Sequence, residues 1–413
     1  MAGAPIPGER RAVVAGGGIV GLAAAAALAR KGWRVALFEA RPGRLARADL
    51  DPEDPAALGA GIQASPNATR CLSALGALDA VAEAGFAPRA ACLRDGRSGR
   101  VVYRAELGRA ARARWGAPYL HVHRHDLARA LAGAARDHGA ALADGMDVTG
   151  WHEGADGVVV ETGDGGRASA DLLVLADGIG SRLAARALGT AEPRFTGQTA
   201  WRALVAAGAL APGTIPPEAT VWAAPGRHAV SYYVAGGQLV NLVAVEERSA
   251  WEREGWSEPG DAGALRAAFA DFAPPLRALV AAVGRPKLWG LFERETVSRW
   301  SAGRVVALGD AAHAMLPFMA QGAAMAIEDA VVLARHLDAA APEAALAAWE
   351  VERRPRVARV AATSRANGAM FHRADGPRRA LSHAAIGAVS RLAPSIAAGR
   401  LDWLYGHDAV REG

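Results

Sequence analysis

The amino-acid sequence predicts an α/β fold with three parts: a domain built on a parallel sheet, an inserted domain of mainly antiparallel sheet, and C-terminal helices. Two apolar runs, Leu172 to Leu175 and Val305 to Leu308, are typical of strands buried on both faces of a parallel sheet. Between residues 195 and 290, Trp, Tyr and Pro become frequent and alternating patterns replace strand–helix units, which favours antiparallel sheet. A chain of 413 residues is long enough for two such domains.

We expect the two domains to alternate along the chain, because one is inserted into the other. The predicted boundaries are residues 1–75, 101–190 and 291–360 for the parallel-sheet domain, 76–100 and 191–290 for the inserted domain, and 361–413 for the C-terminal helices. The C-terminal residues are Ala- and Arg-rich, and we expect their helices to cover the parallel-sheet domain.

The charge pattern argues against nucleic acid as a partner. The net charge of +5 is carried almost wholly by Arg, since Lys occurs only at positions 31 and 287. No basic run is interleaved with aromatic residues, and the basic segment from Arg353 to Arg356 is interpreted as a solvated helix face.

Cysteine usage and hydropathy indicate the compartment. Cys71 and Cys92 lack CxxC spacing, so neither a disulfide framework nor a cysteine zinc site is predicted, and a cytoplasmic location fits. The uncharged span from Ala12 to Ala29 is broken by glycines into a strand, a turn and a helix, so we expect no transmembrane segment.

The first of these glycine turns predicts a Rossmann-like dinucleotide site. Gly16, Gly18 and Gly21 have the G-x-G-x-x-G spacing that allows a tight turn, a close approach of pyrophosphate and a close helix–strand contact. Glu39, at the end of the next predicted strand, stands where an acid binds a ribose 2′-hydroxyl, which disfavours NADP as the ligand of this site. The pattern does not separate FAD from NAD.

The segment from Arg304 to Ala330 predicts a strand, an acidic turn, a loop and a helix. Asp310 follows the buried strand, at the sheet edge where open α/β sheets bind ligands. Pro317 stiffens the loop, and Gly322 begins the helix. The free N–H groups and the partial charge of roughly +0.5 at the start of that helix would favour negative charge in a bound group.

These segments resemble the single-component (group A) FAD-dependent aromatic monooxygenases, which include salicylate hydroxylase, 3-hydroxybenzoate 6-hydroxylase and 6-hydroxynicotinate 3-monooxygenase. Gly309 to Ala330 resembles the second FAD motif of that family, and the segment from Asp177 to Arg182 resembles its third. Three separate signatures in the family's order are more specific than any one of them. The resemblance implies a fold like that of p-hydroxybenzoate hydroxylase, with the inserted sheet as the substrate domain.

The resemblance also implies roles for individual residues. Asp310 would contact the ribityl or pyrophosphate part of FAD, the loop from Pro317 to Gly322 would lie beside the isoalloxazine ring, and Arg124 would reach FAD. The expected cofactor-binding residues are Gly16, Gly18, Gly21, Glu39, Arg41, Arg124, Asp177, Asp310, Pro317, Gly322 and Ala323. The expected substrate-binding residues are Gln63, Trp201, His228, Tyr232 and Pro317, and Gly59 and Gly61 would lie near flavin or substrate. The alternatives are a surface amide for Gln63 and a purely core role for Trp201.

A predicted hairpin carries the expected catalytic residues. Its strands are joined by residues 235–238, and strand alternation places His228 and Tyr232 on one face, roughly 13 Å apart at Cα. In the hydroxybenzoate and hydroxynicotinate hydroxylases, His and Tyr at this spacing line the substrate site. We therefore expect His228 to act as base or relay and Tyr232 to hydrogen-bond the substrate. The alternative is a half-buried structural histidine.

Other histidines could have been ligands. His121, His123 and His125 alternate, so a strand would place them on one face, but no carboxylate or cysteine cluster completes a metal site, and none is predicted. His313, close to Asp310, either contacts flavin or is structural.

The implied reaction is the NAD(P)H- and O2-dependent hydroxylation of a small phenolic or hydroxylated N-heteroaromatic, carboxylated substrate through a C4a-hydroperoxyflavin. No second complete G-x-G-x-x-G occurs, which suits this family, whose members bind NADH or NADPH transiently without a dedicated Rossmann domain. The alternatives are a flavin-dependent epoxidase or oxidase of the same fold, and a non-catalytic flavin-binding sensor. A homodimer is considered as the assembly.

Overall fold

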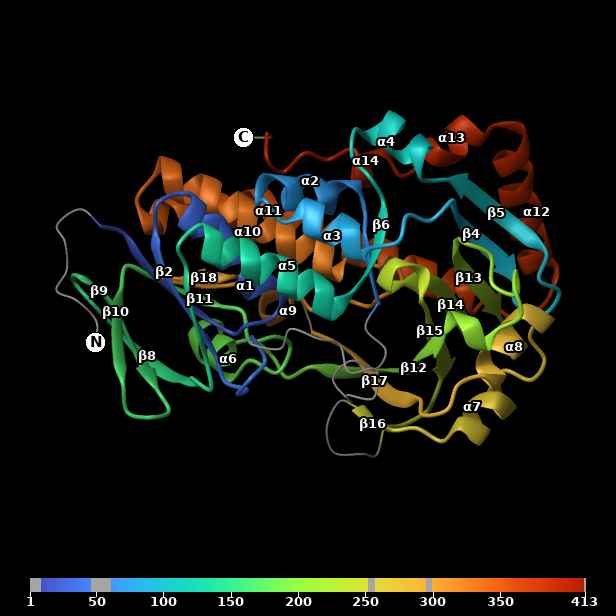
Figure 1. Ribbon diagram of the computed structural model, residues 1–413, viewed down its shortest axis with the longest axis horizontal. Helices are drawn as coiled ribbons and strands as arrows, with labels where there is room; N and C mark the ends of the chain where they lie inside the picture. The colour runs from blue at the N-terminus through green and yellow to red at the C-terminus, as the bar shows by residue number, and fades with distance from the viewer. Residues whose placement is uncertain (1–8, 46–60, 252–256, 295–298, 412–413) are drawn as a thin grey trace.

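The computed structural model of the chain describes residues 9–45, 61–251, 257–294 and 299–411. Gly59, which was expected near flavin or substrate, lies outside this range. The molecule is elongated, with a parallel-sheet domain at one end and an antiparallel-sheet domain at the other (Figure 1). The alternation of the two domains along the chain brings segments distant in sequence into each sheet.

The first domain is built on a six-stranded sheet. Its neighbouring strands run parallel except for the edge pair β18–β19. In spatial order the strands are β18 (Ser301–Ala302), β19 (Val305–Ala307), β11 (Leu172–Leu175), β1 (Arg11–Ala15), β2 (Arg34–Glu39) and β7 (Ala141–Asp144). Both predicted apolar runs, in β11 and β19, are buried in the middle of this sheet, as expected for strands covered on two faces.

The inserted domain is built on an eight-stranded sheet in which every pair is antiparallel except β13–β4. In spatial order the strands are β16 (Ser257–Pro259), β17 (Lys287–Glu293), β12 (Arg194–Ala206), β15 (Leu239–Glu247), β14 (Arg227–Val234), β13 (Ala219–Ala224), β4 (Ala90–Asp95) and β5 (Val101–Glu106). Because β5 pairs with β4, this segment of the inserted domain continues beyond residue 100. The predicted hairpin is β14–β15, turned by η2 (Ala235–Gly237).

The remaining described strands form two small sheets. The three-stranded sheet belongs to the first domain, and the two-stranded sheet lies at the seam between the domains, where β6 contacts β14. Their strands are β10 (Arg167–Ala170), β9 (Gly157–Thr162) and β8 (Val148–Gly154), and β3 (Gly61–Ala64) and β6 (Leu120–His123).

The helices cover both sheets. The described helices are α1 (Ile19–Arg30), α2 (Pro66–Ala74), α3 (Leu78–Ala84), α4 (Arg109–Trp115), α5 (Arg124–Asp137), α6 (Arg182–Leu188), η1 (Ala207–Ala209), α7 (Ala262–Ala268), α8 (Pro274–Ala281), α9 (Asp310–His313), α10 (Gly322–Ala339), α11 (Pro342–Phe371), α12 (Pro377–Leu392), α13 (Pro394–Gly399) and α14 (Asp402–Tyr405). Helix α1 is buried along nearly its whole length because its alanines let α5 and α10 approach closely.

A buried charge cluster joins α10 to α11. Arg353 is 1% exposed and donates to Asp329 at 2.8 Å and to Glu328 at 2.7 Å, while Arg356 also donates to Glu328 at 2.7 Å. The interpretation of this basic segment as a solvated helix face is therefore wrong for Arg353 and Arg356. Their charges are buried because two carboxylates of α10 face them.

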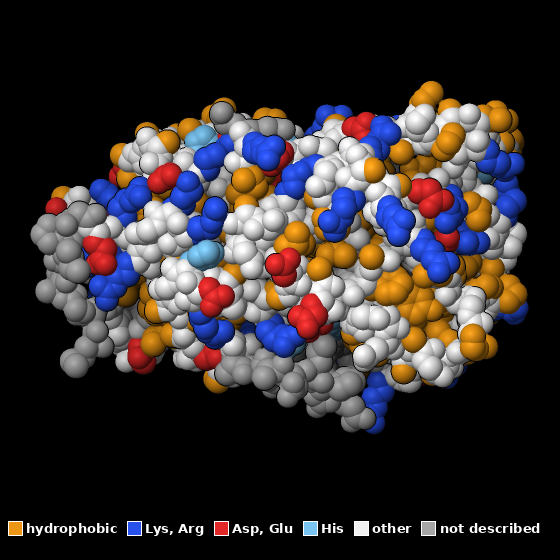
Figure 2. All heavy atoms as spheres, turned by 45° about the horizontal axis from the view of Figure 1, so that its top comes forward, with side chains coloured by type: hydrophobic (Ala, Val, Ile, Leu, Met, Phe, Trp, Pro, Cys, Tyr) orange, Lys and Arg blue, Asp and Glu red, His pale blue; other side chains and the backbone are white. Residues whose placement is uncertain are grey.

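The C-terminal helices cover parts of both domains rather than the parallel-sheet domain alone. Helices α12 and α13 lie against β5 of the eight-stranded sheet, and only α14 packs on α2 of the first domain. Figure 2 shows hydrophobic side chains gathering toward this end of the molecule, while acidic and basic side chains are interspersed over the rest of the face shown. Within the described ranges no helix is long and apolar enough to cross a membrane.

Candidate functional site

A cavity of about 1620 Å³ lies between the two sheets. It is larger than the roughly 300–1,000 Å³ of a typical small-molecule site. Residues at the ends of β1, β2, β11 and β19 line one part, and one face of the eight-stranded sheet lines the other. The cavity is therefore large enough for an extended dinucleotide and a second, smaller ligand.

The glycine turn at one end of the cavity is shaped by close backbone contacts. Gly16 has a φ of +109°, and a Cβ there would lie 2.6 Å from the carbonyl oxygen of Ala176. A Cβ on Gly21 would lie 1.9 Å from the carbonyl oxygen of Gly16. Gly18 precedes α1 without a side-chain cap, so the first N–H groups of this helix are left for a ligand.

Glu39 lies beside this turn and is oriented by the protein. Its carboxylate accepts from the N–H of Gly17 at 2.7 Å and of Arg41 at 3.0 Å, and it pairs with Arg44 at 3.3 Å. Glu39 and Arg41 both line the cavity, as predicted from the sequence. The carboxylate keeps lone pairs that could accept from ribose hydroxyls.

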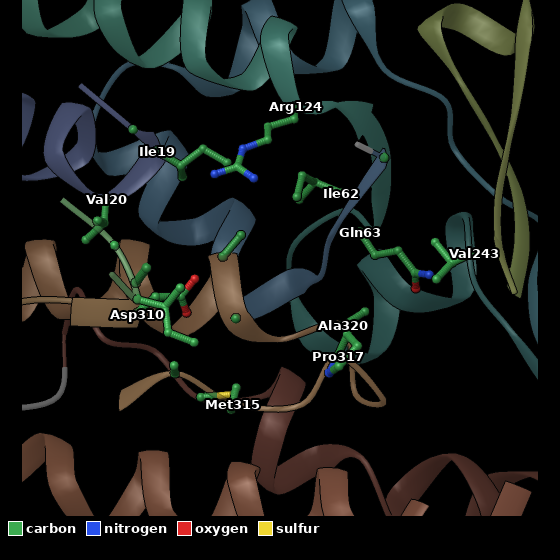
Figure 3. A pocket seen from close by; sticks show the side chains of 18 of the residues that line it. Ile19, Val20, Ile62, Gln63, Arg124, Val243, Asp310, Met315, Pro317 and Ala320 are labelled. Carbon is green, nitrogen blue, oxygen red and sulfur yellow. The ribbon is translucent and has the colours of Figure 1, made fainter. Parts of the chain in front are cut away.

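Arg124 and Asp310 reach into the same space from opposite sides (Figure 3). Arg124 begins α5 and Asp310 begins α9. Desolvation by the surrounding cavity walls lowers the pKa of Arg124, although its side chain is exposed to the open cavity, and the charge of Arg44 lowers it further. In the described part of the chain neither residue has an ion-pair partner, so both are available to a polar ligand.

The loop beside Asp310 is held by α11. The hydroxyl of Ser364 donates to the carbonyl of Leu316 at 2.7 Å, and Asn367 donates to the carbonyl of Phe318 at 3.3 Å. A Cβ on Gly368 would lie 2.6 Å from the Phe318 ring, so glycine is needed for this packing.

The predicted residues of this loop line the cavity. Pro317, Gly322 and Ala323 do so, and α10 starts at Gly322 without a side-chain cap. The start of a second helix therefore points N–H groups toward a ligand.

Asp177 also lines the cavity, at the end of β11. Desolvation by the cavity walls raises the pKa of this carboxyl group, which is exposed to the open cavity, against the hydrogen bond from Ser181. Ser181 in turn caps α6 by accepting from the N–H of Ala184 at 2.9 Å. The third glycine–acid signature thus meets the other two at one cavity.

Gln63 lies near Val243 at the far end of the cavity, as Figure 3 shows. Its side-chain oxygen accepts from the hydroxyl of Tyr119 at 2.7 Å. Tyr119, which the sequence analysis did not single out, also lines the cavity. The position of Gln63 is thus fixed by a buried tyrosine.

The eight-stranded sheet presents alternate side chains to the cavity. His228, Val230 and Tyr232 of β14 line it, as the predicted hairpin face requires. Val243 of β15 pairs with both Val230 and Arg202, so these three side chains form one row across the sheet. The same face therefore carries Arg202 of β12, which lines the cavity.

Trp201 was expected at the substrate, but the structure places it on the opposite face of β12. It packs in the core under that face and donates from its indole N–H to Glu246 at 3.1 Å. Strand alternation is the reason: when Trp201 faces the core, Arg202 faces the cavity.

Arg202 is a cation without a carboxylate partner among the described residues. Its guanidinium lies 5.0 Å from the ring of Trp289, and its Nε has no hydrogen-bond partner there. Burial lowers the pKa of Arg202, and the nearby charge of Arg124 lowers it further. A half-buried cation without a charge partner is stabilised by an anionic ligand.

Tyr232 closes the cavity near β3. Its hydroxyl donates to the carbonyl of Gly61 at 2.7 Å, and a Cβ on Gly61 would lie 2.7 Å from the tyrosine ring. Burial raises the pKa of Tyr232, although the charge of Arg202 opposes this effect. Tyr232 is therefore neutral, and its oxygen can still accept a hydrogen bond.

His228 is 1% exposed and is held between aromatic rings. The rings of Phe318 and Phe371 lie 5.1 and 5.2 Å from it, and its Nδ1 lies 2.6 Å from Nε2 of His372. Burial lowers the pKa of His228 well below its usual range, and His372 lowers it further. At neutral pH the imidazole is uncharged and can accept a proton. No sequence signal marked His372, which ends the long helix α11.

The other histidines do not form a metal site. His125 belongs to α5, so it does not share a strand face with His121 and His123. His313 is 3% exposed and lies 2.6 Å from Asp329, which makes it part of the buried cluster rather than of the cavity lining. No group of three or more metal-ligating side chains occurs among the residues that the structure describes.

The residues present fit FAD. The turn at Gly16 and Gly21 has no room for a Cβ, uncapped helix starts at α1 and α10 face the cavity, and Arg124 and Asp310 have free polar groups. These are the features that bind a pyrophosphate and its flanking hydroxyls.

Comparisons with known proteins agree with this assignment. Residues 9–364 match the FAD binding domain family. The chain is 38% identical over 410 residues to 3-amino-4-hydroxybenzoate 2-monooxygenase of Streptomyces platensis, covering 98% of this chain and 97% of the relative. It is 36% identical over 366 residues to 6-hydroxynicotinate 3-monooxygenase of Bordetella bronchiseptica, covering 87% and 92%. The solved structure of Klebsiella pneumoniae HpxO complexed with FAD and uric acid is similar, with a TM-score of 0.79 and 30% identity over 96% of this chain and 98% of that one.

Proposed function

We propose a substrate class and residue roles from one premise: the chain belongs to the family of FAD-dependent aromatic-ring monooxygenases. These enzymes hydroxylate an aromatic ring with NAD(P)H and O2. The substrate proposed for this chain is a small aromatic ring that carries both a hydroxyl group and a carboxylate, as a hydroxybenzoate or a hydroxynicotinate does.

One observation carries this proposal: a neutral base and an unpaired cation occupy the same face of one sheet. His228 is positioned to accept the proton of a ring hydroxyl, and Arg202 to bind a carboxylate. Their strands are separated by β15 and the two residues are offset by two positions, so their Cα atoms stand roughly 12 Å apart. This separation suits a single ring with substituents at both ends. The names of the two relatives, a hydroxybenzoate and a hydroxynicotinate monooxygenase, support the same class.

The chain's own residues would bind the cofactor, exclude water and move a proton. FAD, when bound, supplies electron transfer from NAD(P)H and activation of O2. The glycine turn, Glu39, Arg41, Arg124, Asp177 and Asp310 would hold its nucleotide and ribityl parts. The start of α10 at Gly322, with Pro317 and Ala323, would stabilise negative charge on the ring system.

At the substrate, His228 would take the hydroxyl proton, which makes the ring a better nucleophile. General base catalysis of this kind is typically worth about 10²–10⁴-fold in rate. Tyr232 and Gln63 would orient the ring, and Phe318 and Phe371 would exclude water.

The proposal is tested by measuring NADH and NADPH consumption, O2 uptake, peroxide and ring-hydroxylated product together. The compounds are 3-amino-4-hydroxybenzoate, 6-hydroxynicotinate and 3-hydroxybenzoate, with uric acid as a comparator that lacks a carboxylate. We expect coupled product formation with at least one of the three carboxylates. Preference for uric acid, or stimulated oxidation without any hydroxylated product, would contradict the proposal.

Two further expectations from the sequence stay predictions. The homodimer is checked by sedimentation of the holoenzyme, and the cytoplasmic location by fractionation of the source cells.

A further inference from the structure

Behind His228, a chain of side chains leads from the cavity to the surface. Nδ1 of His228 lies 2.6 Å from Nε2 of His372, and Nδ1 of His372 lies 2.9 Å from Oε1 of Glu247. His228 and His372 are 1% and 8% exposed, whereas the side chain of Glu247 is 57% exposed. The chain thus connects the buried base with solvent in two hydrogen bonds.

The carboxylate at the outer end fixes the tautomers of both imidazoles. A carboxylate only accepts hydrogen bonds, so His372 donates from Nδ1 to Glu247 and, when neutral, must accept at Nε2. His228 therefore donates from Nδ1, which leaves its Nε2 unprotonated. This arrangement keeps the second ring nitrogen of His228 ready to accept a proton in the cavity that the residue lines.

We propose that His372 and Glu247 form a proton relay that carries the hydroxyl proton of the substrate from His228 to solvent. This inference rests on the hydroxylation proposed above. The substrate O–H bond breaks and an N–H bond forms at Nε2 of His228, while the Nδ1 proton of His228 passes to Nε2 of His372. The Nδ1 proton of His372 passes to Glu247, which releases it to water. One proton leaves the cavity, and both imidazoles end neutral.

The surroundings of the relay suit this role. Among the described titratable groups, His372 faces His228, and Glu247 faces His372 on its other side. The aromatic neighbours are apolar: Phe318 and Phe371 lie against His228, and Phe318 also lies near His372. Burial lowers the pKa of both imidazoles, and Glu247 opposes this effect at His372. A buried cation is costly, so a relay of neutral rings moves the proton without trapping charge or admitting water to the cavity.

The backbone holds the relay in register. The N–H of Gly226 donates to the carbonyl of His372 at 3.0 Å, and the N–H of Glu247 donates to the carbonyl of Gly226 at 3.1 Å. The end of α11 is thus tied to the β14–β15 hairpin at the place where the side chains meet.

The test compares variants of the FAD-loaded enzyme. His372→Gln keeps a side chain that can hydrogen-bond but cannot pass a proton between two ring nitrogens. Glu247→Gln removes the carboxylate that takes up the proton at the end of the relay. The position is exposed, so loss of folding is not expected. Glu246→Gln is the matched control, because Glu246 is the next residue of β15 and bonds Trp201 and Arg248 outside the relay.

The probe is 4-hydroxy-3-nitrobenzoate, whose ring hydroxyl changes its absorbance when it loses a proton. Stopped-flow mixing with oxidised holoenzyme reports the rate at which the probe's hydroxyl ionises, without turnover. The values of kcat and KM are measured with whichever of the three candidate carboxylates the wild-type enzyme hydroxylates. We expect His372→Gln and Glu247→Gln to slow ionisation and to lower kcat about 10-fold or more, within the range of proton-transfer catalysis. KM should stay within about threefold, and Glu246→Gln should behave as wild type.

The outcomes separate the relay from the proposed function. If both relay variants ionise the probe and turn over as fast as wild type, the relay is overturned and the hydroxylation stands. A wild-type enzyme that binds no hydroxylated aromatic carboxylate overturns the proposed function, and the relay with it.

Discussion

The two sheets contribute to the cavity in different ways. The six-stranded sheet offers backbone at its strand ends: glycine turns, helix starts and single acids such as Glu39 and Asp310. The eight-stranded sheet offers a face of side chains, with His228, Tyr232 and Arg202 in neighbouring rows. Backbone contacts restrict the residue type at each position, so they are visible as motifs in the sequence. A sheet face is visible only as an alternation of side chains, and which alternate set faces the cavity depends on how the strands pair. This division predicts that damage to the six-stranded sheet affects cofactor binding and that damage to the eight-stranded sheet affects the substrate.

Gly21→Ala should cause the largest loss on the cofactor side. Its Cβ would lie 1.9 Å from the carbonyl oxygen of Gly16, so the turn must shift, and overpacking of this kind typically costs about 1–3 kcal/mol. We expect little bound FAD, measured by flavin absorbance per protein, and a lower Tm. Gly133→Ala is the control: it lies in α5 with open space around it and should stabilise the fold by roughly 0.4–1 kcal/mol. A fully yellow Gly21→Ala variant would contradict the role of the turn.

His228→Ala should separate the two sheets most clearly. We expect kcat for hydroxylation to fall about 10²–10⁴-fold, because the base is lost, while FAD content stays at the wild-type level. Peroxide released per NAD(P)H consumed should rise. Unchanged coupling between NAD(P)H oxidation and product would remove His228 from the chemistry.

Arg202→Met tests the cation on the sheet face. Met preserves apolar contact with Trp289 but removes the charge, so KM for a carboxylated substrate should rise roughly 10-fold or more, as expected for a lost charged hydrogen bond of about 1.5–3 kcal/mol. The matched control is Arg248→Met, because Arg248 lies 5.6 Å from the Trp201 ring on the other face of the sheet and pairs with Glu246. A similar KM change in both variants would show that the effect is not specific to the cavity.

His121→Phe tests the seam between the sheets, where the expected effect at neutral pH is smallest. His121 is fully buried, and among the described residues neither of its ring nitrogens has a hydrogen-bond partner. Burial lowers its pKa to about 3. Below about pH 6.5 His121 is therefore protonated in the unfolded chain but not in the folded chain. The free energy of unfolding decreases as the pH falls from there toward 3.

Replacing His121 with Phe should reduce this loss of stability at acidic pH. Each such proton contributes about 1.4 kcal/mol per pH unit, so the free energy of unfolding of His121→Phe should fall less steeply than that of wild type between pH 6 and pH 4. Denaturant titrations across this range measure the slope. Identical slopes would show that His121 is not titrating on unfolding.

The same contrast explains what could be predicted from the sequence. Gly16, Gly18, Glu39 and Asp310 were placed at the cavity correctly because turn geometry and strand ends dictate their residue types. His228 and Tyr232 were paired correctly because alternation along one strand is local. The choice of Trp201 failed because the sequence does not state which face of β12 meets the cavity.

Long-range partners were not predictable. His372 lies 144 residues from His228 in sequence, and no motif links it to His228 or to Glu247. Arg353 was interpreted as solvated because its charge partners belong to another helix. In both cases the function of a polar side chain depends on an element that local patterns do not place.

The single parallel pairing in the eight-stranded sheet has a consequence for biosynthesis. Strand β4 is made early, but its partner β13 emerges from the ribosome more than a hundred residues later. Until β13 has been synthesised, the edge of β4 that pairs with it has no hydrogen-bond partner in that strand. Such non-local pairing slows folding. Neither domain is a continuous stretch of chain, so fragments cut at the apparent domain borders should aggregate, and the protein should mature only as a complete polypeptide.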